Sequence, residues 1–302
     1  MPSNRQILLK SRPTGAPSAA NFELVQTPAP EPKDGEVLLK TLYLSLDPYM
    51  RGRMSDGPSY AAPAEVGKPM VGGTVSQIVA SRKAGLAEGD VVGSYVGWQD
   101  YAVSDGTGLT KLDPQVVKPL SLALGLLGMP GMTAYAGLME IGQPKPGETV
   151  VVSAASGAVG SVVGQLAKLK GCRAVGIAGG AAKCRHVVET LGFDACVDHQ
   201  GENLRERIAA ACPKGIDVYF ENVGGAVQRA LWPMLNNFSR VPVCGLIAQY
   251  NEPAAQPGPD LRSVLTKRLT VRGFIVTELW PKYPNAFAEL AQWYHQGKIK
   301  YR

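Results

Sequence analysis

The sequence predicts an α/β protein with two domains: a β-rich N-terminal domain, then a doubly wound parallel sheet covered by helices. Its 302 residues exceed the usual size of one domain, and its 45% hydrophobic content is typical of a globular chain. Short strand patterns separated by turns fill the first part of the chain, whereas strands and helices alternate after about residue 145. We place the domains at residues 1–125 and 126–302.

Strand patterns in the first domain have apolar residues at alternate positions or are rich in Val, Ile and Thr. They cover Glu36 to Ser45, Val71 to Ala80, Asp90 to Val96 and Trp98 to Val103. An uncharged stretch from Pro119 to Met139 is long enough to span a bilayer, but glycines and Pro130 interrupt it. We therefore expect no membrane span there, but a buried helix, a turn at Met129 to Met132 and another helix.

Short apolar runs alternate with helical patterns in the second domain, which is the pattern of a parallel sheet covered on both faces. The predicted strands are Thr149 to Ala154, Arg173 to Ala178, Ala195 to Asp198, Ile216 to Phe220 and Arg240 to Cys244. The predicted helices are Ala158 to Lys170, Ala181 to Leu191, Glu202 to Cys212 and Ala226 to Asn236. Sheets of this kind bind ligands at the carboxyl ends of their strands.

Charge and cysteine content exclude several classes of function. The chain has 31 basic and 25 acidic residues without a long basic run, so we expect no nucleic-acid partner. Residues 1–171 contain no Cys and no His, which removes the soft ligands that a zinc site in that half would need, and we expect no metal. The five cysteines form no CxxC pair and the first twelve residues lack an apolar leader, so we expect a cytoplasmic protein.

A glycine-rich turn between the first predicted strand and helix of the second domain is the strongest functional signal. Read against the GxGxxG pattern, it has Ala155, Gly157 and Gly160 at the three positions. Gly157 would let backbone amides approach a pyrophosphate, and Gly160 would let the helix pack closely on the strand. A merely tight turn is the alternative, but the strand before it and the helix after it favour a dinucleotide site.

Residues after the second strand of this domain favour NADP(H) over NAD. The strand ends in Gly176-Ile-Ala-Gly-Gly180 without the Asp or Glu that usually binds the ribose hydroxyls. Lys183 follows, and its ammonium could pair with the additional phosphate of NADP. An exposed lysine without a ligand is the alternative.

Several motifs resemble those of the zinc-free medium-chain dehydrogenases and reductases. They are segments 44–54 (LSLDPYMRGRM), 97–102 (GWQDYA), 128–135 (GMPGMTAY), 155–160 (ASGAVG), 221–225 (ENVGG) and 244–251 (CGLIAQYN). That group includes leukotriene and prostaglandin reductases and alkenal double-bond reductases. Segments 182–186 (AKCRH), 213–217 (PKGID) and 257–260 (PGPD) are most similar to bacterial NADPH-dependent curcumin reductases.

The resemblance implies a GroES-like catalytic domain, a Rossmann domain, and NADPH-dependent reduction of the carbon–carbon double bond of an enone or enal. It implies a cofactor site made of Gly157, Ala158, Val159, Gly160, Lys183, His199, Asn222, Cys244, Gly245, Tyr250, Phe274, Ile275, Val276, Met129 and Thr133. His199 stands where many relatives have a tyrosine. Relatives also return to the first domain after the last helix, and this sequence ends at Arg302 before such a segment.

Two tyrosines are candidates for the catalytic acid. Tyr250 could hydrogen-bond to the developing enolate or protonate the α carbon, although it could equally only pack on the ligands while water or a ribose hydroxyl supplies the proton. Tyr49 is the weaker candidate, and a wall of the substrate pocket is its alternative role. A quinone reductase and a cofactor-binding protein without turnover remain alternative functions. Dimers are common among relatives, so a homodimer also remains open.

Overall fold

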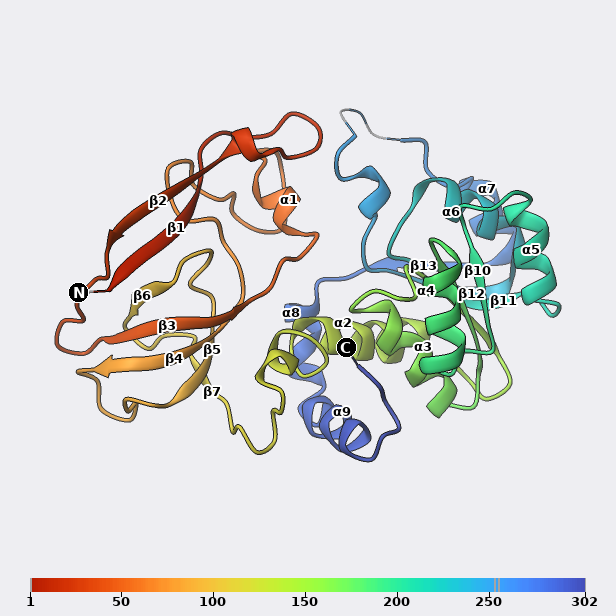
Figure 1. Cartoon of the computed structure of the whole chain (residues 1–302). Helices are drawn as coiled ribbons and strands as arrows, with labels where there is room; N and C mark the ends of the chain where they lie inside the picture. Colours follow the sequence, from red (N-terminus) through yellow and green to blue (C-terminus); the bar gives the residue numbers. More distant parts are fainter. Residues whose placement is uncertain (1, 253, 255, 302) are drawn as a thin grey trace. The chain divides into compact units, whose positions relative to one another are not determined.

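The computed structural model describes residues 2–252, 254 and 256–301 of the chain. It divides into two compact units (Figure 1), of which the first contains Met1–Leu124 and Tyr250–Pro253 and the second contains Gly125–Gln249 and Ala254–Arg302. The sequence-based division had placed all of residues 126–302 in the second domain. The structure instead groups the short segment that begins at Tyr250 with the first unit.

An antiparallel five-stranded sheet in the order β6-β3-β4-β5-β7 forms the main part of the first unit. Its strands are β3 (Val37–Leu44), β4 (Thr74–Ser81), β5 (Val91–Ser94), β6 (Tyr101–Ser104) and β7 (Thr110–Lys111). Alternate residues of β3 enter the core, where Val37 and Leu39 pack with Ile78 and Val92. Strands are present in all four segments predicted in this part of the chain, although each is shorter than expected.

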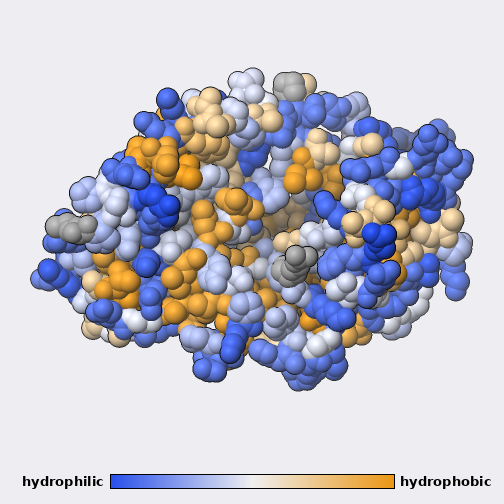
Figure 2. All heavy atoms as spheres, viewed as in Figure 1, coloured by the Kyte–Doolittle hydropathy of each residue, from blue (hydrophilic) through white to orange (hydrophobic). Residues whose placement is uncertain are grey.

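A separate hairpin of β1 (Ser3–Leu9) and β2 (Phe22–Pro28) precedes this sheet. The prolines of this region conceal it in the sequence, but Pro28 is tolerated because it ends an edge strand. The short helix α1 (Met50–Arg53) lies over a second apolar cluster that contains Leu9, Met50 and Met70. Figure 2 shows apolar surface among the polar residues of this unit, whose exposed apolar side chains include Leu24 and Leu46.

A parallel six-stranded sheet in the order β10-β9-β8-β11-β12-β13 forms the centre of the second unit. Its strands are β8 (Thr149–Ser153), β9 (Arg173–Ala178), β10 (Ala195–Asp198), β11 (Ile216–Phe220), β12 (Leu235–Val243) and β13 (Thr270–Gly273). Every residue of β8 is buried, as expected for a central strand covered on both faces. The strand order reverses between β8 and β11, so this sheet has the topological switch point of a Rossmann fold.

Helices surround this sheet and complete the predicted α/β architecture (Figure 1). They are α2 (Met129–Gly137), α3 (Gly160–Leu169), α4 (Ala181–Arg185), α5 (Leu204–Ala211), α6 (Gly225–Leu231), α7 (Leu261–Lys267), α8 (Val276–Leu279) and α9 (Ala286–His295). One core cluster joins strands to helices through residues such as Val175, Ile208 and Leu231. On α3, a Cβ added to Gly164 would lie 1.8 Å from the Phe193 ring, so glycine is needed for this close packing.

The predicted turn at Met129 to Met132 is wrong. These residues form the first turn of α2, for which Gly128 is the N-cap. Pro130 fits there because the first helical turn does not use its backbone N–H groups within the helix. Across the described part of the chain, no helix is long and apolar enough to cross a membrane.

Candidate functional site

The turn between β8 and α3 has the geometry of a phosphate-binding loop. Ala154, directly after β8, has a left-handed backbone with φ of 52°, and its carbonyl accepts the Gly157 N–H at 2.9 Å. A Cβ on Gly160 would lie 2.3 Å from that same carbonyl oxygen, so glycine alone fits. α3 begins at Gly160, so the positive end of its helix dipole lies at this turn and favours an anion there. The N–H groups of Ser161 and Val162 already donate to the carbonyls of Gly157 and Val159, at 3.0 and 3.1 Å.

The rim beyond β9 lacks a carboxylate on its own strand and carries basic side chains. Gly180 has φ of 88° and donates its N–H to the Asp198 carboxylate at 2.8 Å. Asp198 also accepts the N–H of Gln200, and these backbone hydrogen bonds hold the pKa of its carboxyl below the usual value. Lys183 is exposed on α4, and His199 is exposed beside Gly179. The Asp198 carboxylate is therefore committed to the backbone, while two side chains remain available to a phosphate.

A fully buried carboxylate, Glu221, fixes the turn that follows β11. It accepts hydrogen bonds from the hydroxyls of Ser153 and Tyr219, at 3.0 and 2.6 Å, and from the N–H groups of Val223 and Gly224, at 2.7 and 2.9 Å. These donors compensate for the loss of hydration that a buried carboxylate suffers. Burial and the nearby Glu221 charge raise the pKa of Tyr219 well above its usual value, so this phenol remains a donor.

The predicted residue Asn222 is held at the switch point by the same turn. Its side-chain amide donates to the Ser153 carbonyl, and its backbone N–H donates to the Ser153 hydroxyl, both at 2.8 Å. The N–H groups of Cys244 and Gly245 donate to the Glu221 carbonyl, at 2.9 and 3.1 Å. Loss of solvation and the Glu221 charge raise the pKa of the Cys244 thiol to about 12, so it stays protonated at neutral pH. The predicted residues after β8, β11 and β12 are thus brought together.

Sequence reasoning had missed Ser153, Tyr219 and Glu221 as parts of this site. The signal that could have revealed them is an acidic residue placed directly after the apolar strand Ile216–Phe220, where burial requires donors from neighbouring elements.

The remaining predicted residues of the second unit lie on α2 and at the start of α8. The Thr133 hydroxyl donates to the Met129 carbonyl at 2.7 Å, which is a local helix contact. The Phe274 ring meets the Phe220 ring edge to face, with centroids 6.2 Å apart. Ile275 is the N-cap of α8 and Val276 is its first, buried residue. Phe274 therefore adjoins the last residue of β11, one position before Glu221.

Both candidate catalytic tyrosines belong to the first unit. The Tyr49 phenol oxygen lies 2.9 Å from that of Tyr95. Tyr250 is partly exposed and begins the segment grouped with this unit. The next residue, Asn251, accepts a hydrogen bond from Arg51 Nε at 3.2 Å.

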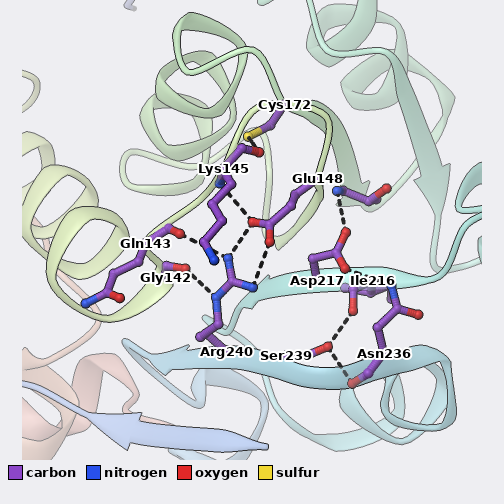
Figure 3. A network of polar contacts seen from close by, with 11 residues as sticks. Gly142, Gln143, Lys145, Glu148, Cys172, Ile216, Asp217, Asn236, Ser239 and Arg240 are labelled. Carbon is purple, nitrogen blue, oxygen red and sulfur yellow. Dashed lines mark hydrogen bonds and ion pairs between the residues drawn. The ribbon is translucent and has the colours of Figure 1, made fainter.

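The amino edge of the six-stranded sheet carries a different polar network (Figure 3). The Arg240 guanidinium forms an ion pair with Glu148, which also accepts the backbone N–H of Lys145. Asp217 accepts the backbone N–H of Thr149 at 2.9 Å and the side-chain amide of Asn236 at 2.8 Å. This network ties the starts of the strands and lies away from the glycine-rich turn.

The carboxyl edge of the sheet fits the dinucleotide NADPH. Side chains at Gly157 and Gly160 would crowd the Ala154 carbonyl, so the turn stays open to a pyrophosphate. The exposed Lys183 and His199 suit a further phosphate. Over the described residues, no group of three or more His, Cys, Asp or Glu side chains is arranged to hold a metal ion.

Two family models match the chain. One, described as the N-terminal domain of oxidoreductase, matches residues 5–112. The other, described as zinc-binding dehydrogenase, matches residues 158–295.

Relatives cover nearly the whole chain. The NADPH-dependent curcumin reductase of Escherichia coli is 53% identical over 99% of this chain and 88% of its own length. Prostaglandin reductase 1 of Mus musculus is 43% identical over 97% of this chain and 88% of its own length. The crystal structure of CurA in complex with NADPH from Vibrio vulnificus is 53% identical, with a TM-score of 0.93, and covers 99% of this chain and 90% of that one. The chain belongs to the medium-chain dehydrogenase/reductase family, in the group that contains the curcumin and prostaglandin reductases.

Proposed function

We propose that this protein is an NADPH-dependent reductase of the carbon–carbon double bond of α,β-unsaturated ketones and aldehydes. The observation that carries the proposal is the open glycine-rich turn after β8, with Lys183 beyond an acid-free end of β9. The relative of E. coli with 53% identity is named an NADPH-dependent curcumin reductase, and curcumin contains conjugated enones. When bound, NADPH supplies a hydride to the substrate.

The second unit binds and orients the cofactor through groups that are already held in place. The turn from Gly157 to Gly160, with Ala158 and Val159, would accept the pyrophosphate at the start of α3. Lys183 and His199 would bind the additional phosphate. Asn222 is fixed by two hydrogen bonds to Ser153, so it cannot turn away from the ribose and nicotinamide end that we assign to it.

The phenol of Tyr49 or Tyr250 would donate a hydrogen bond to the substrate carbonyl, where negative charge develops during reduction. A phenol can also provide the proton that the α carbon requires. Tyr49 has a fixed partner in Tyr95, whereas Tyr250 could instead act by contact with the ligands alone. Phenylalanine replacements that lower turnover but leave NADPH affinity intact would support a catalytic role for either tyrosine.

NADPH oxidation, followed with a panel of enones, enals and quinones, tests the proposed function. We expect the fastest oxidation with an enone or enal. A preference for quinones would favour a quinone reductase, and binding of NADPH without oxidation by any substrate would indicate a protein without turnover. Either of those two results would contradict the proposal.

The Lys183→Ala variant tests the assignment of cofactor preference. Loss of one ammonium at a phosphate should raise the Kd for NADPH about tenfold and leave the Kd for NADH unchanged. Lys170→Ala, at an exposed lysine that follows α3, is the matched control. Equal discrimination against NADH in Lys183→Ala and the unmodified protein would remove Lys183 from the site.

We further propose a homodimer that forms through the edge strand β13. All four residues of β13 are exposed, and Val271 presents 43% of its surface. Among the described strands, β13 pairs only with β12, so its other side can pair with a second chain. Light scattering should show a dimer for the unmodified protein and a monomer for Val271→Lys, and a monomeric unmodified protein would contradict the proposal.

The cysteines support a cytoplasmic location, which we also propose. All five are free thiols, namely Cys172, Cys184, Cys196, Cys212 and Cys244. Reduced cysteines are typical of proteins in a reducing compartment.

A further inference from the structure

Two phenols of the first unit form a hydrogen-bonded pair that the sequence did not indicate. Tyr49 and Tyr95 are distant in the sequence, yet their oxygens lie 2.9 Å apart. The sheet explains this meeting, because Leu44 of β3 pairs with Thr74 of β4, which pairs with Ser94 of β5. The chain leaves the sheet at the same edge after Leu44 and after Ser94, and this places both tyrosines there.

The two phenols differ in their surroundings. Tyr49 is half-buried and packs against the cluster that contains Met50 and Met70, whereas Tyr95 keeps 52% of its surface exposed. Loss of solvation, the hydrogen bond to Tyr95 and the nearby Asp47 raise the pKa of Tyr49, while Arg53 acts in the opposite direction. Burial also raises the pKa of Asp47. Tyr49 is therefore a neutral donor at neutral pH, and its phenolate would be costly without a donor beside it.

We propose that Tyr95 is the positioning residue of Tyr49 and returns a proton to it from water during each reduction. This inference rests on the proposed function, in which a double bond gains a hydride at the β carbon and needs one proton at the α carbon. The O–H bond of Tyr49 breaks as its proton moves to the α carbon. The O–H bond of Tyr95 breaks as its proton moves to the Tyr49 oxygen, and water restores Tyr95. The net uptake is one proton from solvent.

Phenylalanine variants remove either hydroxyl and keep the ring. We expect Tyr95→Phe to lower kcat with an enone at least tenfold and to change the KM for NADPH less than twofold. Tyr49→Phe should lose at least as much. The double variant should equal Tyr49→Phe, because Tyr95 acts only through Tyr49. Tyr43→Phe, at an exposed tyrosine of β3, is the matched control and should keep full activity.

A solvent isotope measurement distinguishes proton transfer from simple support of the ring. Single-turnover rates in mixtures of H₂O and D₂O should show two protons in motion for the unmodified protein and one for Tyr95→Phe. Normal activity of Tyr95→Phe would overturn the proposed role of Tyr95. A double variant whose fold-loss in kcat is the product of the two single fold-losses would also overturn it, because the two tyrosines would then act independently. Unmodified protein that oxidises no NADPH with any enone would instead overturn the proposed function. Circular dichroism and NADPH titration show whether each variant is folded.

Discussion

The two edges of the six-stranded sheet each hold a glutamate, and the two differ in their partners. At the amino edge, Glu148 is paired with the charged Arg240, and both side chains keep about a fifth of their surface, 20% and 17%, in contact with solvent. At the carboxyl edge, Glu221 is fully buried and bound by uncharged donors, two hydroxyls and two backbone N–H groups. The comparison shows two ways to fix a sheet edge.

The uncharged donors at Glu221 suit a site that binds an anion. A guanidinium at this position could leave Glu221 and pair with the pyrophosphate, whereas hydroxyls and amides satisfy Glu221 without adding a positive charge. Val223 and Gly224, whose N–H groups donate to Glu221, belong to the loop that follows β11. This loop therefore cannot move without leaving a buried carboxylate unsatisfied. The ion pair of Glu148 with Arg240 joins the start of β8 to β12.

Removal of the buried carboxylate should have the largest effect. Glu221→Ala leaves the Tyr219 hydroxyl and two backbone N–H groups without their acceptor, while the Ser153 hydroxyl keeps the Phe220 carbonyl, and it opens a cavity, so we expect a loss of about 3–4 kcal/mol in the free energy of unfolding. The Kd for NADPH should rise at least tenfold because Asn222 loses its support. Glu221→Gln keeps the volume and one acceptor oxygen, so it should lose less unfolding free energy and less NADPH affinity than Glu221→Ala. Urea unfolding and NADPH titration measure the two quantities, and unchanged NADPH affinity in Glu221→Ala would contradict the role of this edge.

Crowding of the glycine-rich turn by an added side chain should have the second-largest effect. Gly160→Ala places a Cβ 2.3 Å from the Ala154 carbonyl oxygen, and because that neighbour is backbone, the turn must shift. We expect a loss of about 2–3 kcal/mol in unfolding free energy and a Kd for NADPH at least tenfold higher. Gly57→Ala in the first unit, where a Cβ would meet nothing within 4 Å, is the control and should change neither value. Tight NADPH binding by Gly160→Ala would show that the turn is not the phosphate site.

Loss of the ion pair should affect stability alone. Arg240→Met keeps an apolar stem but removes the contacts to Glu148 and to the carbonyls of Gly142 and Gln143. We expect a loss of about 2 kcal/mol in unfolding free energy. Calorimetry should therefore show a lower Tm, while NADPH titration should give a Kd within twofold of the original. A large loss of NADPH affinity would remove the distinction between the two edges.

Acid should weaken the contribution of the Glu148–Arg240 ion pair to the free energy of unfolding, and this is the smallest expected effect. Burial raises the pKa of Glu148, but the hydrogen bonds from Arg240 and the Lys145 N–H outweigh it, so its pKa is lowered in the folded protein. Its contribution to stability is therefore fully present above the unfolded value of about 4.3 and is lost as the pH falls through the lower folded value. The gap in unfolding free energy between Arg240→Met and the unmodified protein should shrink below about pH 4. A gap that stays constant down to pH 3 would contradict this assignment.

Local pattern was sufficient to predict the glycine-rich turn and most strands of the six-stranded sheet. It missed β13, β7 and the hairpin of β1 and β2, and it extended a helix to Asn236 although β12 begins at Leu235. The apolar runs around Thr149 and Arg173 and the glycines at positions 157 and 160 are contiguous signals, and the structure has the expected elements there. Helix α2 was divided wrongly because Pro130 breaks most helices but not the first turn of one. A sequence pattern does not distinguish a proline that ends one helix from a proline in the first turn of the next, because the difference depends on where the helix begins.

Pairings between distant residues could not be predicted in the same way. Tyr95 meets Tyr49 only because three strands align their ends, and no spacing in the sequence encodes that alignment. Ser153 and Tyr219 likewise become important only once β8 and β11 lie side by side. Contacts that depend on sheet order are beyond a local reading of residues.

The backbone of Ala154 has a consequence for protein engineering. A left-handed alanine costs about 1 kcal/mol relative to ordinary geometry, and this alanine stands directly before the glycine-rich turn. Asparagine tolerates that geometry better, so position 154 is a natural first choice when a more heat-resistant catalyst is wanted. Valine or isoleucine at the same position would have the opposite result, and libraries that randomise this loop should omit them.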